Sequence, residues 1–332
     1  MNKKNQILII GSGSIGKRHL RNLINLGYRD ICLIRRQKKK LIDFPFLEVY
    51  TSIKEACNKN TFNFAIIATP SSMHYQNFIE ISNENIPNVY IEKPIATNIN
   101  EAIKIEKISK LKDINVCVGF DLHFDLGLIK VKELLKNNVI GNICSFQVEV
   151  GQFLPDWRVN EDYRKGMSAK KKLGGGVMLD LIHEFDYVNW IFGPIIKVFG
   201  KNNQISNLEI ETEDVSFNIV QTKSGIFGSI YLDYLQKELS RQCKIVGNNG
   251  TIIWNYKDST VKWMTHQDVI WKEFEYKEIS RNDRFIEIIK AFIESNSEIK
   301  DNRLSNIEDA IQSLKMIEIS KQSNIENKFM SI

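Results

Sequence analysis

The chain has 332 residues, of which 43% are hydrophobic and 26% are charged. This length is enough for two ordinary domains, and the composition is that of a folded globular protein, which excludes a disordered chain. The formal net charge of +5 is too small an excess to indicate a nucleic-acid partner, although it leaves room for a local site that receives an anion.

The cysteines and the apolar runs indicate the cellular compartment in which the protein is expected. The five cysteines lie far apart without a Cys-x-x-Cys pair, which argues against a disulfide framework or a zinc ribbon and suits a reducing environment. No histidine spacing suggests a metal site. The first apolar run, 7–10, is too short for a signal peptide, and no stretch reaches the ~20 apolar residues of a membrane helix. We therefore expect a cytoplasmic protein without a metal or a membrane partner.

The first 120 residues alternate short apolar runs with helix patterns. Continuous apolar runs predict strands that are buried on both faces, at residues 7–10, 31–34, 64–68, 89–91 and 116–118. Helix start signals lie between them at Ser52 and Asn98. Alternation of strand and helix predicts a doubly wound parallel sheet, so residues 1–120 are expected to form a Rossmann domain.

After residue 120 the pattern changes to alternating polar and apolar residues. A helix pattern at 126–137 comes first, and half-buried strands are predicted at 143–150, 215–221, 226–234, 241–246 and 251–256. Helix patterns at 282–294 and 307–321 close the chain, the second with a predicted capping box from Ser305 to Glu308. Residues 121–332 are therefore expected to form an α+β domain with a large, mostly antiparallel open sheet.

A glycine-rich turn joins the first strand to the first helix. Gly11, Gly13 and Gly16 have the spacing of a dinucleotide-binding loop, in which glycines allow a tight turn and a close approach to a pyrophosphate at the helix N-terminus. An ordinary glycine-rich turn is the alternative, but the strand before it and the helix after it favour the nucleotide. The expected cofactor-binding residues of this loop are Gly11, Gly13, Ser14, Ile15 and Gly16.

The second strand ends in Arg35 and Arg36. NAD-binding proteins commonly place an acidic residue near this point to accept from the ribose 2′-hydroxyl, whereas arginine accommodates a 2′-phosphate. The two arginines favour NADP over NAD. A solvated basic loop is the alternative, because three lysines follow at 38–40, and an arginine can also stack on adenine.

Five motifs resemble, in sequence and in order, those of the Gfo/Idh/MocA oxidoreductases. They are A-T-P-S-S-M-H at 68–74, E-K-P at 92–94, G-F-D-L-H-F at 119–124, G-G-G-V-M-L-D at 174–180 and E-D-A at 308–310. The resemblance runs through the whole chain, and is nearest to members associated with bacterial surface-sugar biosynthesis. It implies an NAD(P)-dependent dehydrogenase or reductase that acts on CH–OH groups. It also implies that the cofactor contacts Thr69, Pro70, His74, Glu92 and Lys93.

Lys93 is the first candidate catalytic residue. It follows a predicted parallel strand, and open α/β sheets bind ligands in the crevice at the carboxyl ends of their strands. A lysine beside a nicotinamide can transfer a proton, or it can stay charged and polarise a developing alkoxide. A surface lysine in a loop is the alternative. In the resembled family this lysine is catalytic or orients the substrate.

A second candidate group follows the three glycines at 174–176. On one predicted helix, Asp180, His183, Glu184 and Tyr187 fall on a common face. This face is either solvated or catalytic, with His183 as general base and Asp180 orienting it or binding a hydroxyl. The glycines favour the catalytic interpretation, because a backbone without side chains can come near a ligand. The resembled family usually has D-x-x-x-H, so His183 is one place early or belongs to a D-x-x-H-E subgroup.

Substrate contacts are expected from two segments. Asp121 stands where the resembled family commonly has Asn, and His123 where it commonly has Arg. A loop of more than twenty residues before the three glycines is the second segment. Its aromatic side chains can stack on a sugar or base, and its cations can contact phosphate or carboxylate, although a solvent-facing or oligomer-facing loop explains them equally. The predicted substrate-binding residues are Asp121, Trp157, Arg158, Tyr163 and Arg164.

These expectations combine into one main hypothesis and two alternatives. The main hypothesis is hydride transfer between a nicotinamide cofactor and a secondary alcohol or ketone of a sugar or nucleotide sugar, in surface-polysaccharide or glycan biosynthesis. One alternative keeps the fold and uses transient oxidation for elimination or hydrolysis. The other is a cofactor-sensing regulator, which should tolerate loss of the lysine and the histidine that are present here. The resemblance also implies a homo-oligomer, a dimer or tetramer, formed through the outer face of the sheet.

Overall fold

The computed structural model describes residues 6–157, 161–277, 280–295 and 301–332, and the chain divides into two compact units. The first unit is Met1–Asp121 with Arg281–Ile311, and the second is Leu122–Ser280 with Gln312–Ile332. The boundaries expected from the sequence differ from this division at Asp121 and in the segment Arg281–Ile311, which both belong to the first unit. Within the described ranges, no helix is both long enough and apolar enough to span a membrane.

The first unit contains a six-stranded parallel sheet in the order β3-β2-β1-β4-β5-β6, which confirms the predicted Rossmann fold. Its strands are β1 (Ile7–Ile10), β2 (Ile31–Ile34), β3 (Glu48–Tyr50), β4 (Phe64–Ile67), β5 (Asn88–Ile91) and β6 (Asn115–Val118). Its helices are α1 (Ser14–Asn25), α2 (Ile53–Cys57), α3 (His74–Asn83), α4 (Ile99–Lys112) and α8 (Arg281–Glu294). Strands β1, β2 and β4 are buried along their whole length, as continuous apolar runs predict.

Two predicted helix caps are confirmed and a third is shifted. The side chains of Ser52 and Asn98 accept from the N–H groups of Glu55 and Glu101, at 3.1 and 3.0 Å. The capping box before α9 (Ile307–Glu326) instead joins Asn306 to Asp309, each backbone N–H donating to the other's side chain at 3.1 and 2.9 Å. The predicted Ser305–Glu308 box is therefore wrong by one residue, because α9 begins at Ile307 and Asn306 is the residue before it.

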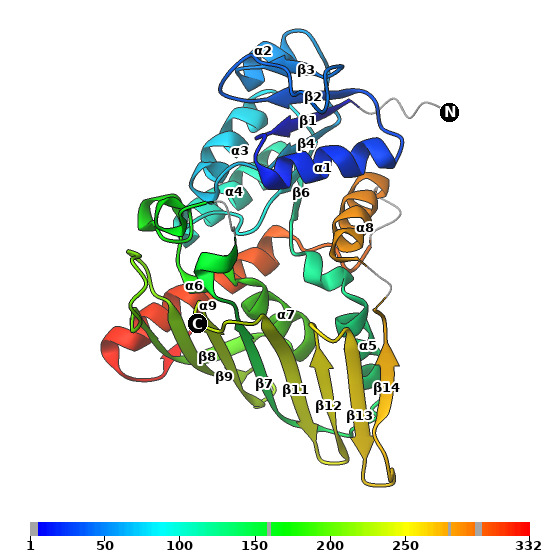
Figure 1. Ribbon diagram of the computed structural model, residues 1–332, viewed down its shortest axis with the longest axis vertical. Coiled ribbons are helices and arrows are strands. Elements are labelled where there is room, and N and C mark those ends of the chain that lie inside the picture. Colours follow the sequence, from blue (N-terminus) through cyan, green and yellow to red (C-terminus); the bar gives the residue numbers. More distant parts are fainter. Residues whose placement is uncertain (1–5, 158–160, 278–279, 296–300) are drawn as a thin grey trace. The chain divides into compact units, whose positions relative to one another are not determined.

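The helix α8 explains why the chain returns to the first unit (Figure 1). The side-chain amides of Asn22 on α1 and Asn282 on α8 donate to each other at 3.3 and 2.8 Å. Arg284 of α8 forms a buried ion pair with Asp121, with 2.9 Å between Nε and Oδ2. These contacts join segments far apart in the sequence, so a local pattern could not place α8 in this unit.

The second unit contains a nine-stranded sheet in the order β14-β13-β12-β11-β7-β10-β9-β8-β15, in which β7 and β10 pair in parallel and the other pairs are antiparallel. Its strands are β7 (Ile143–Gly151), β8 (Ile195–Asn203), β9 (Val215–Thr222), β10 (Phe227–Asp233), β11 (Ser240–Gly247), β12 (Gly250–Asn255), β13 (Thr260–Thr265), β14 (Lys272–Glu275) and β15 (Met330–Ser331). Its helices are α5 (Leu126–Lys136), α6 (Val177–Asp180), α7 (His183–Phe192) and most of α9. The predicted α+β domain with a mostly antiparallel sheet is confirmed.

The helix α7 packs through aromatic side chains on the sheet of the second unit. Phe192 stacks on Phe146 of β7 with 4.0 Å between ring centroids, and Tyr187 lies edge-on to Trp254 of β12 at 5.8 Å. All four rings are buried. This packing fixes α7 against one face of the sheet and so determines where His183, at its first turn, can point.

Candidate active site

The loop between β1 and α1 has the geometry of an anion-binding turn. A Cβ on Gly11 would lie 2.5 Å from the Ala68 carbonyl oxygen, and one on Gly16 would lie 2.1 Å from the Gly11 oxygen, so neither position accepts a side chain. By contrast, no atom lies within 4 Å of the place where a Cβ on Gly13 would be. The helix α1 begins after Gly13 without a side-chain cap and without an acidic residue in its first turn. Its first N–H groups thus fit a pyrophosphate.

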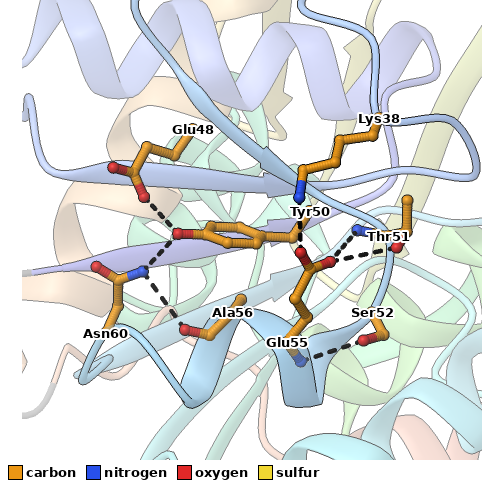
Figure 2. A network of polar contacts seen from close by, with 8 residues as sticks. All are labelled: Lys38, Glu48, Tyr50, Thr51, Ser52, Glu55, Ala56 and Asn60. Carbon is orange, nitrogen blue, oxygen red and sulfur yellow. Dashed lines mark hydrogen bonds and ion pairs between the residues drawn. The ribbon is translucent and has the colours of Figure 1, made fainter.

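The cations that follow β2 differ in their partners, and Figure 2 shows the partner of Lys38. The Lys38 ammonium lies 2.7 Å from Glu55 Oε1, and this hydrogen bond lowers the pKa of Glu55. Thr51 also donates to the same carboxylate from its backbone N–H and its hydroxyl, at 3.2 Å each. The Arg35 guanidinium donates to the Lys39 carbonyl at 2.9 Å, whereas Arg36 is exposed. Lys38 is therefore held by α2, and Arg36 presents its charge to solvent.

The loops after β4 and β5 are joined by His74. Its Nδ1 lies 2.8 Å from the Pro94 carbonyl oxygen and its Nε2 lies 2.9 Å from the Thr69 carbonyl oxygen. The ring is buried, and burial lowers the pKa of His74. The Thr69 hydroxyl is also engaged, since it donates to Asn77 Oδ1 at 2.9 Å. His74 therefore links the two loops that are expected at the cofactor.

Glu92 and Lys93 follow β5 directly, and Lys93 precedes a cis proline, Pro94. The Glu92 carboxylate is buried and its Oε1 lies 2.5 Å from Nε2 of His19, on α1. Lys93 is partly exposed. The residue before the candidate lysine is thus anchored to the helix that begins at the glycine loop.

The predicted single helix after the three glycines is wrong, because Leu181 leaves the helical conformation and separates α6 from α7. Asp180, His183 and Glu184 are only 8%, 7% and 0% exposed. Apolar side chains of the same segment, such as Leu179 and Phe185, are buried as well. The solvated-face alternative is therefore excluded.

Asp180 is held by a tyrosine that sequence reasoning did not select. The Tyr234 hydroxyl donates to Asp180 Oδ2 at 2.6 Å, and both side chains are buried. Burial, together with the neighbouring Asp180, raises the pKa of Tyr234 well above its usual value, so it stays a donor. Trp157 lies edge-on to the Tyr234 ring at 5.3 Å and 88°. The structure thus brings one predicted substrate-binding residue next to the partner of a predicted catalytic residue.

The other predicted residues of the long loop pair with acidic neighbours. Arg164 forms ion pairs with Asp162 and with Glu209, at 2.8 and 3.2 Å. The Tyr163 hydroxyl accepts from the backbone N–H of Glu209 at 3.3 Å. Arg158 lies outside the described residues. Tyr163 and Arg164 therefore contact the segment before β9, and their role toward a substrate remains a prediction.

Glu184 is anchored from the sheet. Its Oε1 lies 2.8 Å from Nε of Arg241 on β11, and the Arg241 side chain is only 11% exposed. The guanidinium also lies 5.5 Å from the centre of the Tyr256 ring. This ion pair fixes the first turn of α7, which is the turn that carries His183.

The three glycines serve the packing of the chain itself. A Cβ on Gly175 would lie 2.3 Å from the Met167 carbonyl oxygen, and one on Gly176 would lie 2.5 Å from Glu213 Oε1. Gly174 and Gly176 also have positive φ angles of +83° and +118°. The expectation that the glycines make room for a ligand is therefore corrected for Gly175 and Gly176, since protein atoms fill the space beside both.

Glu213 gives a pH-dependent prediction. Burial raises the pKa of the Glu213 carboxyl in the folded protein above its ordinary value of 4.5. The protonated side chain therefore stabilises the fold fully below pH 4.5, and this stabilisation is lost as the pH rises through the pKa of the folded protein. Glu213→Gln should therefore raise the melting temperature at neutral pH, and the gain should disappear below pH 4.5. Thermal unfolding at several pH values measures this.

Glu211 is the matched control for that prediction. It is exposed and pairs with Lys170 at 2.7 Å, and the hydrogen bond from Lys170 lowers the pKa of Glu211. Glu211→Gln should not raise the melting temperature at neutral pH, because the ionised Glu211 carboxylate is stabilised by the Lys170 ammonium. A gain of equal size in both variants would contradict the role of burial at Glu213.

Comparison with known proteins identifies the family. The chain matches the family model "Oxidoreductase family, NAD-binding Rossmann fold" over residues 5–120 and "Oxidoreductase family, C-terminal alpha/beta domain" over residues 132–332. The chain belongs to the Gfo/Idh/MocA oxidoreductase family.

Two relatives and one solved structure are similar to this Gfo/Idh/MocA chain over most of its length. Oxidoreductase P35 of Formosa agariphila is 29% identical, over 70% of this chain and 72% of its own length. Myo-inositol 2-dehydrogenase of Thermotoga maritima is 24% identical over 87% of each chain. The solved structure of levoglucosan dehydrogenase in complex with NADH has a TM-score of 0.87 at 16% identity, covering 99% of each chain. The structural likeness supports the Gfo/Idh/MocA fold.

Asp121 and His123, which depart from the common Gfo/Idh/MocA pattern, each have a structural partner. Asp121, in place of Asn, forms the buried ion pair with Arg284. His123, in place of Arg, has its Nε2 2.8 Å from Asp186 Oδ2, and its ring stacks on Trp190 at 4.2 Å and 11°. The Asp121 carboxylate is thus engaged by Arg284, and its contact with substrate stays a prediction.

Proposed function

We propose that the protein transfers a hydride between a nicotinamide nucleotide and a secondary alcohol or ketone of a sugar, polyol or nucleotide sugar. The observation that carries this proposal is the β1–α1 loop, where Gly13 faces open space and α1 begins without a side-chain cap. Lys93, in the same unit, follows a strand of the same parallel sheet. Family membership and the dehydrogenase names of several relatives support the reaction type.

The proposed roles in the first unit follow from its geometry. The N-terminus of α1 binds the pyrophosphate through Gly13, Ser14 and Ile15, with Gly11 and Gly16 shaping the turn. A bound nicotinamide nucleotide supplies the acceptor or donor of the hydride. Lys93 either moves the hydroxyl proton at its Nζ or uses its charge to stabilise a developing alkoxide.

The proposed roles in the second unit rest on buried polar side chains. His183 acts as general base toward a substrate hydroxyl. Asp180, held by the Tyr234 hydroxyl at 2.6 Å, orients that base or binds a hydroxyl. Trp157 offers an aromatic surface for a sugar ring beside Tyr234. A role in surface-polysaccharide or glycan biosynthesis is part of the proposal and rests on the D-x-x-H-E pattern.

The proposal of an anion-binding turn predicts the effect of a side chain at Gly13. Gly13→Val should leave the fold intact, because its φ of −68° is ordinary and no atom lies within 4 Å of a Cβ there. The added side chain should occupy the approach of the pyrophosphate, weakening NADH and NADPH binding by at least about tenfold, or ~1.4 kcal/mol. Fluorescence titration and thermal unfolding measure the two effects. Unchanged affinity for both nucleotides would contradict the proposed turn.

We also propose that NADP is preferred and that Arg36 contacts its 2′-phosphate. Arg36→Met should weaken NADPH binding by about 10-fold or more, since a hydrogen bond to a charged group contributes ~1.5–3 kcal/mol, and should change NADH binding little. Lys38→Met is the matched control, because Lys38 is held by Glu55 at 2.7 Å. Equal losses for NADPH and NADH in Arg36→Met would instead support stacking on adenine.

The proposed cellular state is a cytoplasmic homo-oligomer, a dimer or tetramer. All five cysteines are free, which supports a reducing compartment. Phe217, Ile219 and Phe227 expose 56%, 46% and 51% of their surface on neighbouring strands, which supports association through the sheet. Sedimentation equilibrium tests this, and a monomer at micromolar concentration would refute it.

A further inference from the structure

Lys93 lies between two residues that are each held by a buried histidine. On one side, Nε2 of His19 lies 2.5 Å from Oε1 of Glu92. On the other side, Nδ1 of His74 lies 2.8 Å from the carbonyl oxygen of Pro94. The short segment 92–94 is therefore fixed at both ends, once through a side chain and once through the backbone.

Both histidines are fully inside the first unit. His19 is 0% exposed, and its ring lies edge-on to Tyr90 at 5.2 Å and to Phe285 of α8 at 6.2 Å. His74 is 1% exposed and contacts the Thr69 carbonyl through its second nitrogen at 2.9 Å. The low local dielectric strengthens hydrogen bonds in such surroundings. The contact of His19 with Glu92 and the contact of His74 with Pro94 therefore resist exchange with water.

The two histidines come from elements that begin at the candidate cofactor loops. His19 lies on α1, which starts directly after the glycine loop. His74 begins α3, one 3-10 turn (Ser71–Met73) after the loop that carries Thr69 and Pro70. Through these two side chains, the loops after β1 and β4 both contact the segment that carries Lys93. A displacement of either loop is thus transmitted to the backbone beside Lys93.

We propose that His19 and His74 are positioning residues that fix Lys93 for proton transfer, an inference that rests on the proposed catalytic role of Lys93. His19 acts through Glu92 and His74 acts through the Pro94 carbonyl. Misplacing a reacting group by about 1 Å can lower a rate by about 100-fold. Loss of either contact should therefore lower kcat by about 10-fold to 100-fold, with KM and the Kd for NAD(P)H changed by less than about threefold.

Conservative variants separate this role from a general loss of packing. A Gln Nε2 stands where His19 has its Nε2, so His19→Gln keeps an N–H toward Glu92, whereas His19→Leu does not. A neutral His74 ring carries one N–H, and we place it on Nδ1, toward the Pro94 carbonyl. The Nδ2 of Asn stands where His74 has its Nδ1, so His74→Asn keeps an N–H toward Pro94, whereas His74→Gln offers an N–H only toward Thr69. We expect His19→Gln and His74→Asn to retain most of kcat, and His19→Leu and His74→Gln to lose it.

A second readout does not need a substrate. Trace labelling with acetic anhydride, followed by mass spectrometry, compares the reactivity of Lys93 with that of the exposed Lys136. Release of one hydrogen bond should raise the relative reactivity of Lys93 by about fivefold in His19→Leu and in His74→Gln, and leave it unchanged in the conservative variants. If His19→Leu does not fold, Glu92→Gln weakens the same contact and should change the labelling in the same direction.

The outcomes distinguish this inference from the proposed function. His266→Leu replaces an exposed histidine and should match the unaltered protein in every measurement. Unchanged labelling of Lys93 and unchanged kcat in His19→Leu and His74→Gln would overturn the positioning role. A fall in cofactor affinity with kcat preserved would overturn it as well, because the histidines would then serve nucleotide binding. If the unaltered protein binds neither NADH nor NADPH, the proposed function fails, while the labelling pattern still reports on the contacts.

Discussion

Lys93→Met is expected to lower kcat by about 10²-fold to 10⁴-fold, the usual contribution of a positioned proton donor or acceptor. Methionine is similar in length to lysine and cannot carry a proton or a charge. Because Lys93 is partly exposed and the adjacent contacts of Glu92 and Pro94 remain, the fold should be retained. Steady-state kinetics with a sugar that the unaltered protein oxidises measure the effect.

Two comparisons sharpen the Lys93 result. Lys107→Met removes an exposed lysine of α4 in the same unit and should leave kcat unchanged. The Kd for NAD(P)H of Lys93→Met should stay within about threefold of the original, since the main cofactor contacts are proposed at the β1–α1 loop and the contact expected from Lys93 adds little to them. If kcat is preserved in Lys93→Met, Lys93 is not the catalytic lysine and the proposed role is contradicted.

Arg241→Met should destabilise the second unit by about 3–5 kcal/mol, the usual result of removing one partner of a buried ion pair. Glu184 is fully buried on α7, and the guanidinium of Arg241 lies 2.8 Å from its carboxylate. Methionine fills part of the arginine volume but offers no positive charge, so the carboxylate loses a strong compensating interaction. Chemical denaturation, followed by tryptophan fluorescence, measures the change in the free energy of unfolding.

The control for Arg241 is an ion pair of similar length on the surface. Lys170 and Glu211 lie 2.7 Å apart, with side chains 39% and 52% exposed. Lys170→Met should change the free energy of unfolding by less than about 1 kcal/mol, because water and salt screen exposed pairs. Similar losses in both variants would show that burial does not determine the strength of the Arg241–Glu184 contact. Because His183 lies directly before Glu184 in the first turn of α7, a loss of activity at low denaturant concentration should accompany the instability.

Much of the first unit could be predicted because its strands are buried on both faces. The runs at β1, β2 and β4 are apolar at every position, and such short runs in a folded chain are typical of strands that are covered on both faces. The strand β3 was missed because it has only three residues and begins with an exposed glutamate. The strand β8 was missed because an irregularity between Ile195 and Lys197 shifts its register and breaks the alternation.

The parts that could not be predicted depend on contacts between distant residues. Asp121 and Arg284 are 163 positions apart, and only the folded chain shows that they meet. The same is true of Asp180 and Tyr234, which are 54 positions apart. The break between α6 and α7 is a change in the backbone at Leu181, where the residue type gives no breaker signal.

The residues of the candidate site also fall into two groups: those that a sequence motif marks, and those that only a contact in the folded chain reveals. Lys93, Asp180 and the glycine loop were found because motifs mark them in the sequence. His19 and Tyr234 were not selected, since one histidine in a helix and one tyrosine at a strand end have no local signal. Their roles depend on buried contacts with Glu92 and Asp180.

Hydride transfer itself is the most direct test of the proposed function. The protein is incubated with NADP⁺ or NAD⁺ and, in turn, with myo-inositol, simple aldoses and UDP-linked sugars, and the absorbance of the reduced nicotinamide is followed. We predict reduction of the nucleotide with at least one of these compounds, faster with NADP⁺, and its loss in Lys93→Met. Failure to bind either nucleotide, or tight binding with no net reduction by any compound or oxidation by the corresponding ketones, would contradict the proposal.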